Sequence, residues 1–154
     1  MKRTLIIAIV ILACFIIVGC EYDVPITAQP TRAIDTALLG DWTSRDGKDT
    51  IKVNRWDGSN YVVWQDGSLF RVYHSDVENS AFVSVQLLAQ DKPKYAYWSW
   101  KLSNDGTLHL RIVDDQLVPD DTTNSARVQE LLKQNLQNPT LLGNETEFLK
   151  SKSD

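Results

Sequence analysis

The sequence predicts a mainly β domain, an antiparallel meander that forms a small barrel or a strongly curved sheet. Three observations lead to this fold class. Tight-turn dipeptides recur about every ten residues, several runs between them alternate apolar and polar residues, and a helical stripe appears only near the end. Alternation with a period of two is typical of half-buried strands, and Asp-Gly is a strong hairpin signal. We therefore expect about seven or eight strands, with one helix before the last.

The turns place the strands. Asp-Gly or Asn-Asp-Gly turns fall at residues 46–47, 57–58, 66–67 and 104–106. Strands are expected at residues 41–46, 49–56, 60–66, 69–76, 81–89, 94–103 and 107–113. Two runs, 61–64 and 82–88, are apolar on both faces, so their second face should be covered by the helix or by a partner.

One helix and a closing strand follow. Thr123 or Asn124 can cap a helix that runs to about residue 137, and Pro139 ends it. Its apolar residues recur at helical spacing: Val128, Leu131, Leu132 and Leu136. We expect this stripe to cover the sheet or the open end of a barrel. Alternation then predicts a last strand at residues 145–150.

The first residues have the features of a secretion signal. Lys2 and Arg3 precede an uncharged, apolar run at residues 4–18, and Ile17-Val18-Gly19-Cys20 closes it. This tetrapeptide resembles the lipobox of bacterial lipoproteins. The resemblance implies cleavage before Cys20 and lipid on its thiol, which anchors the protein in a membrane. The alternative is an uncleaved signal anchor, but the run is short for a span of roughly 20 residues.

The residue after the lipobox bears on location. In lipoproteins an Asp at that position favours retention in the inner membrane of some bacteria, and Glu21 differs from it. The resemblance therefore favours the outer membrane, with the protein facing the periplasm.

The chain divides into four parts: a signal peptide at 1–19, a lipidated cysteine with an extended tether at 20–33, a β-barrel-like domain at 34–150, and a disordered tail at 151–154. Pro25 and Pro30 favour an extended tether, which would let the domain stand away from the lipid. The alternative is that Val24 and Ile26 pack onto the domain.

Charge and cysteine content exclude several classes of function. The formal net charge is -4, and loss of Lys2 and Arg3 with the leader gives -6 (-4 minus 2). Without a basic cluster, the chain is a poor candidate for binding nucleic acid. The two cysteines are Cys14, within the leader, and Cys20. This excludes an intramolecular disulfide framework in the mature chain and any cysteine-rich metal site.

Few residues indicate chemistry. His74, Asp76 and Glu78 alternate at a strand end and share a face, which a solvated strand end explains as well as a metal site. His109 with Arg111 forms an outward pair that could contact an anion, and the acidic run at 114–121 has no EF-hand spacing. Nucleophile elbows and phosphate-binding loops are absent from the sequence. We therefore expect no enzyme, no cofactor and no metal.

The five tryptophans are the best candidates for a binding site. Trp42, Trp56 and Trp64 could line a pocket for a small apolar ligand. Trp98 and Trp100 are expected in the core. Gly40-Asp41-Trp42 resembles the Gly-x-Trp opening of lipocalins and other calycins, in which the Trp lies under the base of an up-and-down barrel.

Two functions remain open from the sequence. The first is a membrane-anchored lipoprotein of the cell envelope with a non-enzymatic interaction or envelope-maintenance role, in contact with an envelope protein partner. The second is a lipocalin-like carrier of a small apolar ligand. A hollow barrel interior would favour the carrier, and a packed interior would favour the interaction protein.

Overall fold

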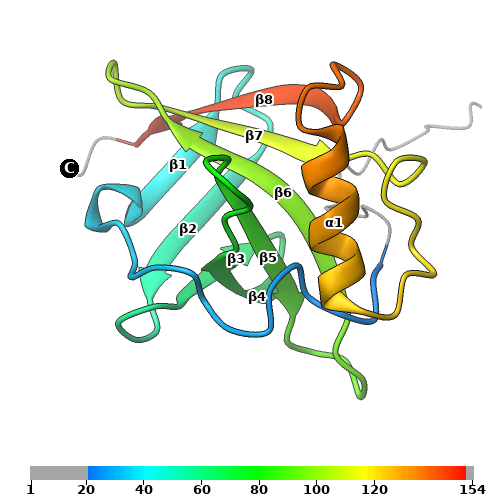
Figure 1. Ribbon diagram of the computed structural model, residues 1–154. Coiled ribbons are helices and arrows are strands. Elements are labelled where there is room, and N and C mark those ends of the chain that lie inside the picture. Colours follow the sequence, from blue (N-terminus) through cyan, green and yellow to red (C-terminus); the bar gives the residue numbers. More distant parts are fainter. Residues whose placement is uncertain (1–20, 152–154) are drawn as a thin grey trace, which may run out of the picture.

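The computed structural model describes residues 21–151, which form a closed antiparallel barrel of eight strands with one helix on its outside (Figure 1). The strands pair in chain order, and β1 pairs with β8 to close the barrel. This confirms the predicted β meander with a helix before the last strand. Of the two predicted forms, a small barrel and a strongly curved sheet, the structure has the barrel. The predicted leader at 1–19, Cys20 and residues 152–154 lie outside the described residues.

The observed strands lie between the turns that the sequence predicts. The strands are β1 (Gly40–Ser44), β2 (Thr50–Arg55), β3 (Tyr61–Gln65), β4 (Ser68–His74), β5 (Phe82–Leu87), β6 (Tyr95–Leu102), β7 (Thr107–Val113) and β8 (Leu142–Lys150). A short 3-10 helix, η1 (Thr36–Leu38), precedes β1, and α1 (Ser125–Asn135) lies between β7 and β8. The last strand begins three residues earlier than expected, at residue 142 instead of 145.

The β3–β4 hairpin shows how the turns set the register. Asp66 and Gly67 both have positive φ, 49° and 80°, as the two central residues of a type I′ turn require. The turn pairs Gln65 with Ser68 and carries the register on to Tyr61 and Val72. As a result Tyr61 and Gln65 face the barrel interior and are buried, whereas Trp64 faces outward.

The main core lies inside the barrel, and one end of the barrel is closed by η1 and Trp42. Asp35 caps η1 by accepting a hydrogen bond from the Ala37 N–H. The indole Nε1–H of Trp42 donates to the Leu38 carbonyl at 3.0 Å, and both residues are buried. The ammonium of Lys150 lies 5.3 Å from the centre of the Trp42 ring, within cation–π range. We refer to this end as the closed end.

A second core lies outside the sheet, under α1. Asn124 caps the helix, its side chain accepting from the N–H groups of the next turn. Val128 and Leu132 are buried against the outer faces of the strands, where they pack with Phe82 and Tyr97. The helical stripe therefore covers the sheet and not the barrel end. It covers Phe82 of the run at 82–88, whereas Leu88 at the end of that run remains exposed.

Residues 22–27, which we call the N-terminal strap, are packed onto the barrel. In Figure 1 this blue segment crosses the outside of the strands. Tyr22 exchanges backbone hydrogen bonds with Tyr95, at 2.8 and 2.9 Å, and stacks on Tyr97 at 3.8 Å. The Ile26 N–H donates to Ser84 Oγ at 3.0 Å, and only 1% of Tyr22 and 0% of Ile26 is exposed.

The strap corrects the expectation of an extended tether over residues 20–33. Burying the side chains of Tyr22 and Ile26 contributes about 1.5–3 kcal/mol each, and the backbone pairing with Tyr95 adds to it, which together oppose the entropy lost when the segment is ordered. The alternative foreseen for Val24 and Ile26 describes the segment better. The folded part of the chain therefore begins near residue 22 and not near 34.

Candidate functional site

The barrel contains a partly open cavity of about 90 Å³. It lies toward the end that carries the β1–β2 and β3–β4 turns, opposite the closed end. Its walls come from β2 through β8, and it is lined by Asp49, Ile51, Val63, Gln65, Phe70, Val72, Val83, Val85, Trp98, Trp100, Leu110, Thr146 and Phe148. Most of these side chains are apolar, so the cavity is suited to an apolar group.

Two of the three polar residues of the cavity sit where strands meet turns. Asp49 precedes β2, Gln65 ends β3, and Thr146 lies in β8. Burial raises the pKa of Asp49, and the neighbouring carboxylates of Asp46 and Asp66 raise it further. Lys48, which pairs with Asp46 at 3.7 Å, offsets one of these three carboxylates, and the remaining negative charge favours neutral or cationic groups over anions.

Several polar atoms in the cavity wall have no hydrogen-bond partner. Among the described residues, the buried unpaired side-chain atoms include Gln65 Oε1, Trp98 Nε1 and Trp100 Nε1, and all three residues line the cavity. An unpaired buried polar group costs about 1–3 kcal/mol. The three atoms are themselves buried, so a polar group in the cavity would reach them only after the side chains turned toward it.

The cavity size limits what can enter. Drug-sized ligands occupy pockets of about 300–1,000 Å³, and an engineered apolar cavity of about 150 Å³ holds benzene. A volume of about 90 Å³ therefore takes a short aliphatic end, not a whole lipid. The rest of such a ligand would remain at the mouth, beside Asp49 and Gln65.

The three tryptophans predicted as ligand contacts do not come together. Trp42 is buried at the closed end, with 1% exposed. Trp56 is 52% exposed in the turn after β2, and Trp64 is 43% exposed on the outer face of β3. Trp98 and Trp100, expected to be core residues, are the two tryptophans that line the cavity.

The alternation of side chains along each strand explains why the tryptophans that line the cavity differ from the predicted ones. Trp98 and Trp100 share a face of β6 with Ala96, and all three pack in the interior cluster. Trp64 alternates with Val63 and Gln65, both of which line the cavity, so it must point outward. Tyr61, Val63 and Gln65 occupy the inward positions of β3. This alternation was the signal that could have excluded Trp64 from the cavity.

The sequence cluster His74, Asp76 and Glu78 is dispersed in the structure. His74 is buried inside the barrel and faces Tyr61, whereas Asp76 pairs with Arg32 at 2.8 Å. Glu78 pairs with Lys133 of α1 at 2.5 Å. These side chains have separate partners, so they do not form a common ligand set.

An apolar row crosses the outer face of three strands near the mouth. Trp64 of β3 pairs with Leu69 of β4, and the N–H of Leu88 donates to the Leu69 carbonyl at 3.0 Å. The three side chains are 43%, 47% and 36% exposed, respectively. We call Trp64, Leu69 and Leu88 the apolar row. Adjacent exposed large apolar side chains are a common feature of interaction surfaces.

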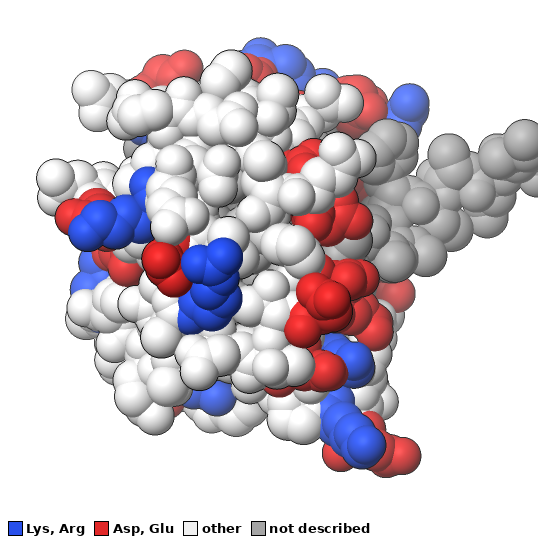
Figure 2. Space-filling model, turned by 45° about the vertical axis from the view of Figure 1, so that its right-hand side comes forward, with Lys and Arg blue, Asp and Glu red and all other residues white. Residues whose placement is uncertain are grey.

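The start of the described chain lies in an acidic region. Figure 2 shows Asp and Glu side chains gathered on one side of the molecule, with few Lys or Arg among them. Lys94 bonds Asp23 at 2.6 Å, and the carboxylates of Asp23, Glu21 and Asp120 raise the pKa of its ammonium group. Acidic charge at this position opposes contact with an anionic lipid surface.

Comparison with known proteins finds no family model, no curated protein and no solved structure that matches this chain. Within residues 21–151, no helix has both the length and the apolar composition needed to span a membrane. The candidate site therefore rests on the geometry of the barrel alone.

Proposed function

We propose that this chain is a lipid-anchored, non-enzymatic binding protein of the bacterial cell envelope, whose barrel binds the short apolar end of a small amphiphile. The observation that carries the proposal is the apolar cavity with unpaired polar atoms on Gln65, Trp98 and Trp100. The apolar end would fill the cavity, and the polar group would remain at the mouth, beside Asp49 and Gln65. This is the role of a lipocalin-like carrier, scaled to a small ligand.

The position of the strap supports an anchor beside the mouth. Glu21, the residue after Cys20, lies next to Gln90 in the β5–β6 loop, with their side chains 3.4 Å apart. In an up-and-down barrel this loop is at the same end as the β1–β2 and β3–β4 turns, which carry Asp49 and Gln65 nearby. Lipid on Cys20 would therefore hold the mouth close to a membrane, and we propose the outer membrane, facing the periplasm.

The anchor is tested by Cys20→Ser. The wild-type chain should incorporate labelled fatty acid and lose residues 1–19, whereas the variant should remain a full-length, unlabelled precursor. Cys14→Ser is the matched control, because it removes a thiol from the same apolar run and should be processed normally. Normal processing and acylation of Cys20→Ser would overturn the lipoprotein assignment.

The cavity is tested with three ligands that share one chain: octylamine, octanol and octanoate. Binding is followed by tryptophan fluorescence in a Trp56→Phe, Trp64→Phe background, which removes the two most exposed indoles and leaves Trp42 at the closed end and the cavity residues Trp98 and Trp100. We expect octylamine and octanol to bind more tightly than octanoate, because the mouth is acidic.

A cavity-filling variant makes the test specific. Val85→Phe adds bulk to the cavity wall and should abolish the fluorescence change, whereas Leu69→Phe places the same side chain outside the barrel and should preserve it. Thermal unfolding of both variants controls for loss of fold. If Val85→Phe binds as the wild type does, or if none of the three ligands binds, the cavity is not the site.

A second candidate function is contact with an envelope protein, and the apolar row favours it. Crosslinking in intact envelopes should trap a discrete adduct of the wild-type protein. Leu69→Lys should remove this adduct because it places a charge in the middle of the row, whereas the exposed Leu149→Lys on β8 should not. An adduct that survives Leu69→Lys would exclude the row as the contact surface.

A further inference from the structure

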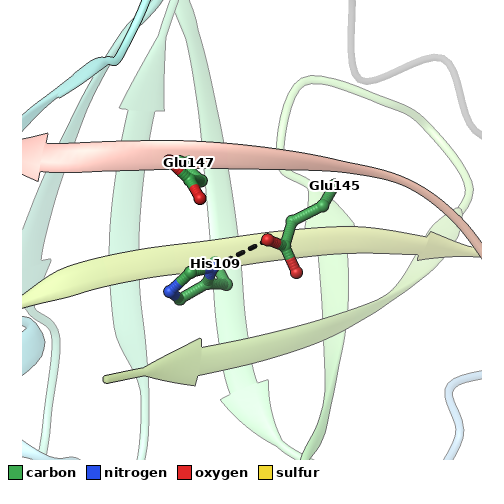
Figure 3. A group of neighbouring side chains, drawn as sticks. All are labelled: His109, Glu145 and Glu147. Carbon is green, nitrogen blue, oxygen red and sulfur yellow. Dashed lines mark hydrogen bonds and ion pairs between the residues drawn. The ribbon is translucent and has the colours of Figure 1, made fainter. Parts of the chain in front are cut away.

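Three side chains that can ligate a metal meet on the outer surface of the barrel, across β7 and β8 (Figure 3). His109 pairs directly with Glu147 in the ladder, and Glu145 is two residues earlier on the same strand, opposite Arg111. One imidazole nitrogen and one oxygen from each carboxylate lie within 4.8 Å of one another. Figure 3 shows both glutamates directed toward the imidazole from the neighbouring strand.

The two ring nitrogens of His109 have different surroundings. Nε2 lies 3.3 Å from the Ser103 hydroxyl, which in turn donates to the Asp105 carboxylate. Nδ1 lies 2.9 Å from Glu145 Oε1 and is the ring nitrogen closer to a carboxylate. A metal ion would replace the hydrogen in this short contact and be bound by both atoms.

We propose that His109, Glu145 and Glu147 bind a divalent transition-metal ion, with Zn²⁺ as the best match. Imidazole nitrogen and carboxylate oxygen are ordinary zinc ligands, and three protein ligands with a water complete a tetrahedral site. Metal bonds of about 2.0–2.2 Å place adjacent ligand atoms roughly 3–3.5 Å apart, close to the Nδ1–Oε1 separation. The contact from Nε2 to Ser103 holds the ring in the orientation that exposes Nδ1.

The same contacts do not form a catalytic triad. Ser103, His109 and Glu145 follow the order of nucleophile, base and orienting carboxylate, but the Ser103 hydrogen points to Asp105 and not to the imidazole. The barrel cavity lies on the other face of the sheet, where Thr146 and Leu110 contribute to its wall. The geometry thus favours ligation of a cation over activation of a serine.

Nearby cations set the strength of the site. Arg45 forms an ion pair with Glu147, and Lys101 is opposite His109 on β6. Arg111 does not compete, because its guanidinium donates to the carbonyls of Leu142 and Gly143, each at 2.9 Å. A metal ion must displace Arg45, which is 59% exposed and free to swing into solvent. We therefore expect micromolar affinity that increases when Arg45 is neutralised.

The metal would act on the ligand cavity from outside. Thr146 lies between Glu145 and Glu147 and points inward to the cavity, whereas the two glutamates point outward. An ion that ties both glutamates to His109 would fix this segment of β8 against β7. Ligand binding to the folded state also raises stability, so added Zn²⁺ should raise the unfolding temperature.

The test uses the full chain in detergent, with Cys14→Ser and Cys20→Ser so that no thiol can bind metal. Zn²⁺ is titrated by calorimetry, and Co²⁺ absorption reports the coordination geometry. We expect one ion per chain, and a loss of tenfold or more in affinity for each of His109→Ala, Glu145→Gln and Glu147→Gln. Glu130→Gln, an exposed carboxylate on α1, is the control and should bind as the parent does.

Two further results decide the ligand set. Arg45→Gln should bind Zn²⁺ more tightly than the parent, and equal or weaker binding would remove Glu147 from the site. In long-range nitrogen-15 spectra, Zn²⁺ should shift the ring signals of His109 and not those of His74, the only other histidine. Zn²⁺ binding of unchanged affinity in His109→Ala, or none in the parent, would overturn the proposal.

Discussion

Tyr61 and His74 are joined by a 2.8 Å hydrogen bond between Oη and Nε2 inside the closed end of the barrel. The Asp35 N–H donates to the same Tyr61 oxygen at 2.6 Å, and His74 Nδ1 is buried without a partner among the described residues. The contact links η1, β3 and β4, and the burial of the ring favours a neutral imidazole.

The first prediction concerns pH. Burial lowers the pKa of His74 from 6.5 to about 4; Arg32 acts in the same direction, and the carboxylates of Asp76 and Asp35 oppose it. Above pH 6.5 both states are neutral and this group adds no pH dependence. Below it the unfolded chain binds a proton that the folded chain excludes, so stability should fall between pH 6.5 and about 4, by about 3 kcal/mol in total.

His74→Gln checks this prediction, because a glutamine oxygen can still accept from Tyr61 and does not titrate. Urea unfolding is measured for both proteins from pH 7 to pH 4. The difference in unfolding free energy between wild type and variant should shift by about 3 kcal/mol over that range. A pH-independent difference would show that His74 does not carry the effect.

The second prediction concerns the closed end. Trp42→Phe removes the donor to the Leu38 carbonyl and leaves a small void, so it should cost about 2 kcal/mol. Trp56→Phe, at a position that is 52% exposed, should change stability by less than about 0.5 kcal/mol. Equal unfolding midpoints in urea for the two variants would contradict the role assigned to Trp42.

The third prediction separates packing from hydrogen bonding in the strap. Tyr22→Phe keeps the stacking on Tyr97 and loses the 2.7 Å hydrogen bond to the Val118 carbonyl, for a cost of about 1 kcal/mol. Tyr22→Ala loses both and should cost about 3 kcal/mol. Limited proteolysis should then cleave Tyr22→Ala within residues 22–27 faster than Tyr22→Phe, and similar rates would show that the stacking does not hold the strap.

The fourth prediction concerns the glycine that opens β1. Gly40 has φ +129°, and a side chain there would also meet Lys150 Cε at 2.9 Å. Gly40→Ala should therefore destabilise the protein by about 1–3 kcal/mol. Gly58→Ala, in open space in the next loop, is the matched control and should be neutral in the same unfolding assay.

Local patterns predicted most of the fold. The Asp66-Gly67 turn, the alternation in β6 and the Asn124 cap are short-range features, and each has the predicted place in the structure. The strap was harder to foresee, because Tyr22 and Ile26 lie on either side of Pro25 and have no period that marks an element. Their partners, Tyr97 and Ser84, are more than fifty residues away in sequence.

The candidate sites depended on register, which sequence alone left open. Aromatic content pointed to Trp56 and Trp64, but the phase of β3 and the β2–β3 turn put both outside. The cluster of His109 with Glu145 and Glu147 requires that β7 and β8 pair in one register across the intervening helix. A shift of one residue would turn His109 to the opposite face of the sheet from these carboxylates.

The strap also determines which contacts would bear a pulling force applied to the N-terminal side of the domain. A pull on the chain ahead of Glu21 would reach the Tyr22–Tyr95 backbone pair first, together with the Tyr22 hydrogen bond to Val118. The β1–β8 seam that closes the barrel lies farther along the chain, behind residues 22–27. A force on the N-terminus would therefore detach the strap before it reached the strands of the barrel. The strap would thus protect the barrel from unfolding under load.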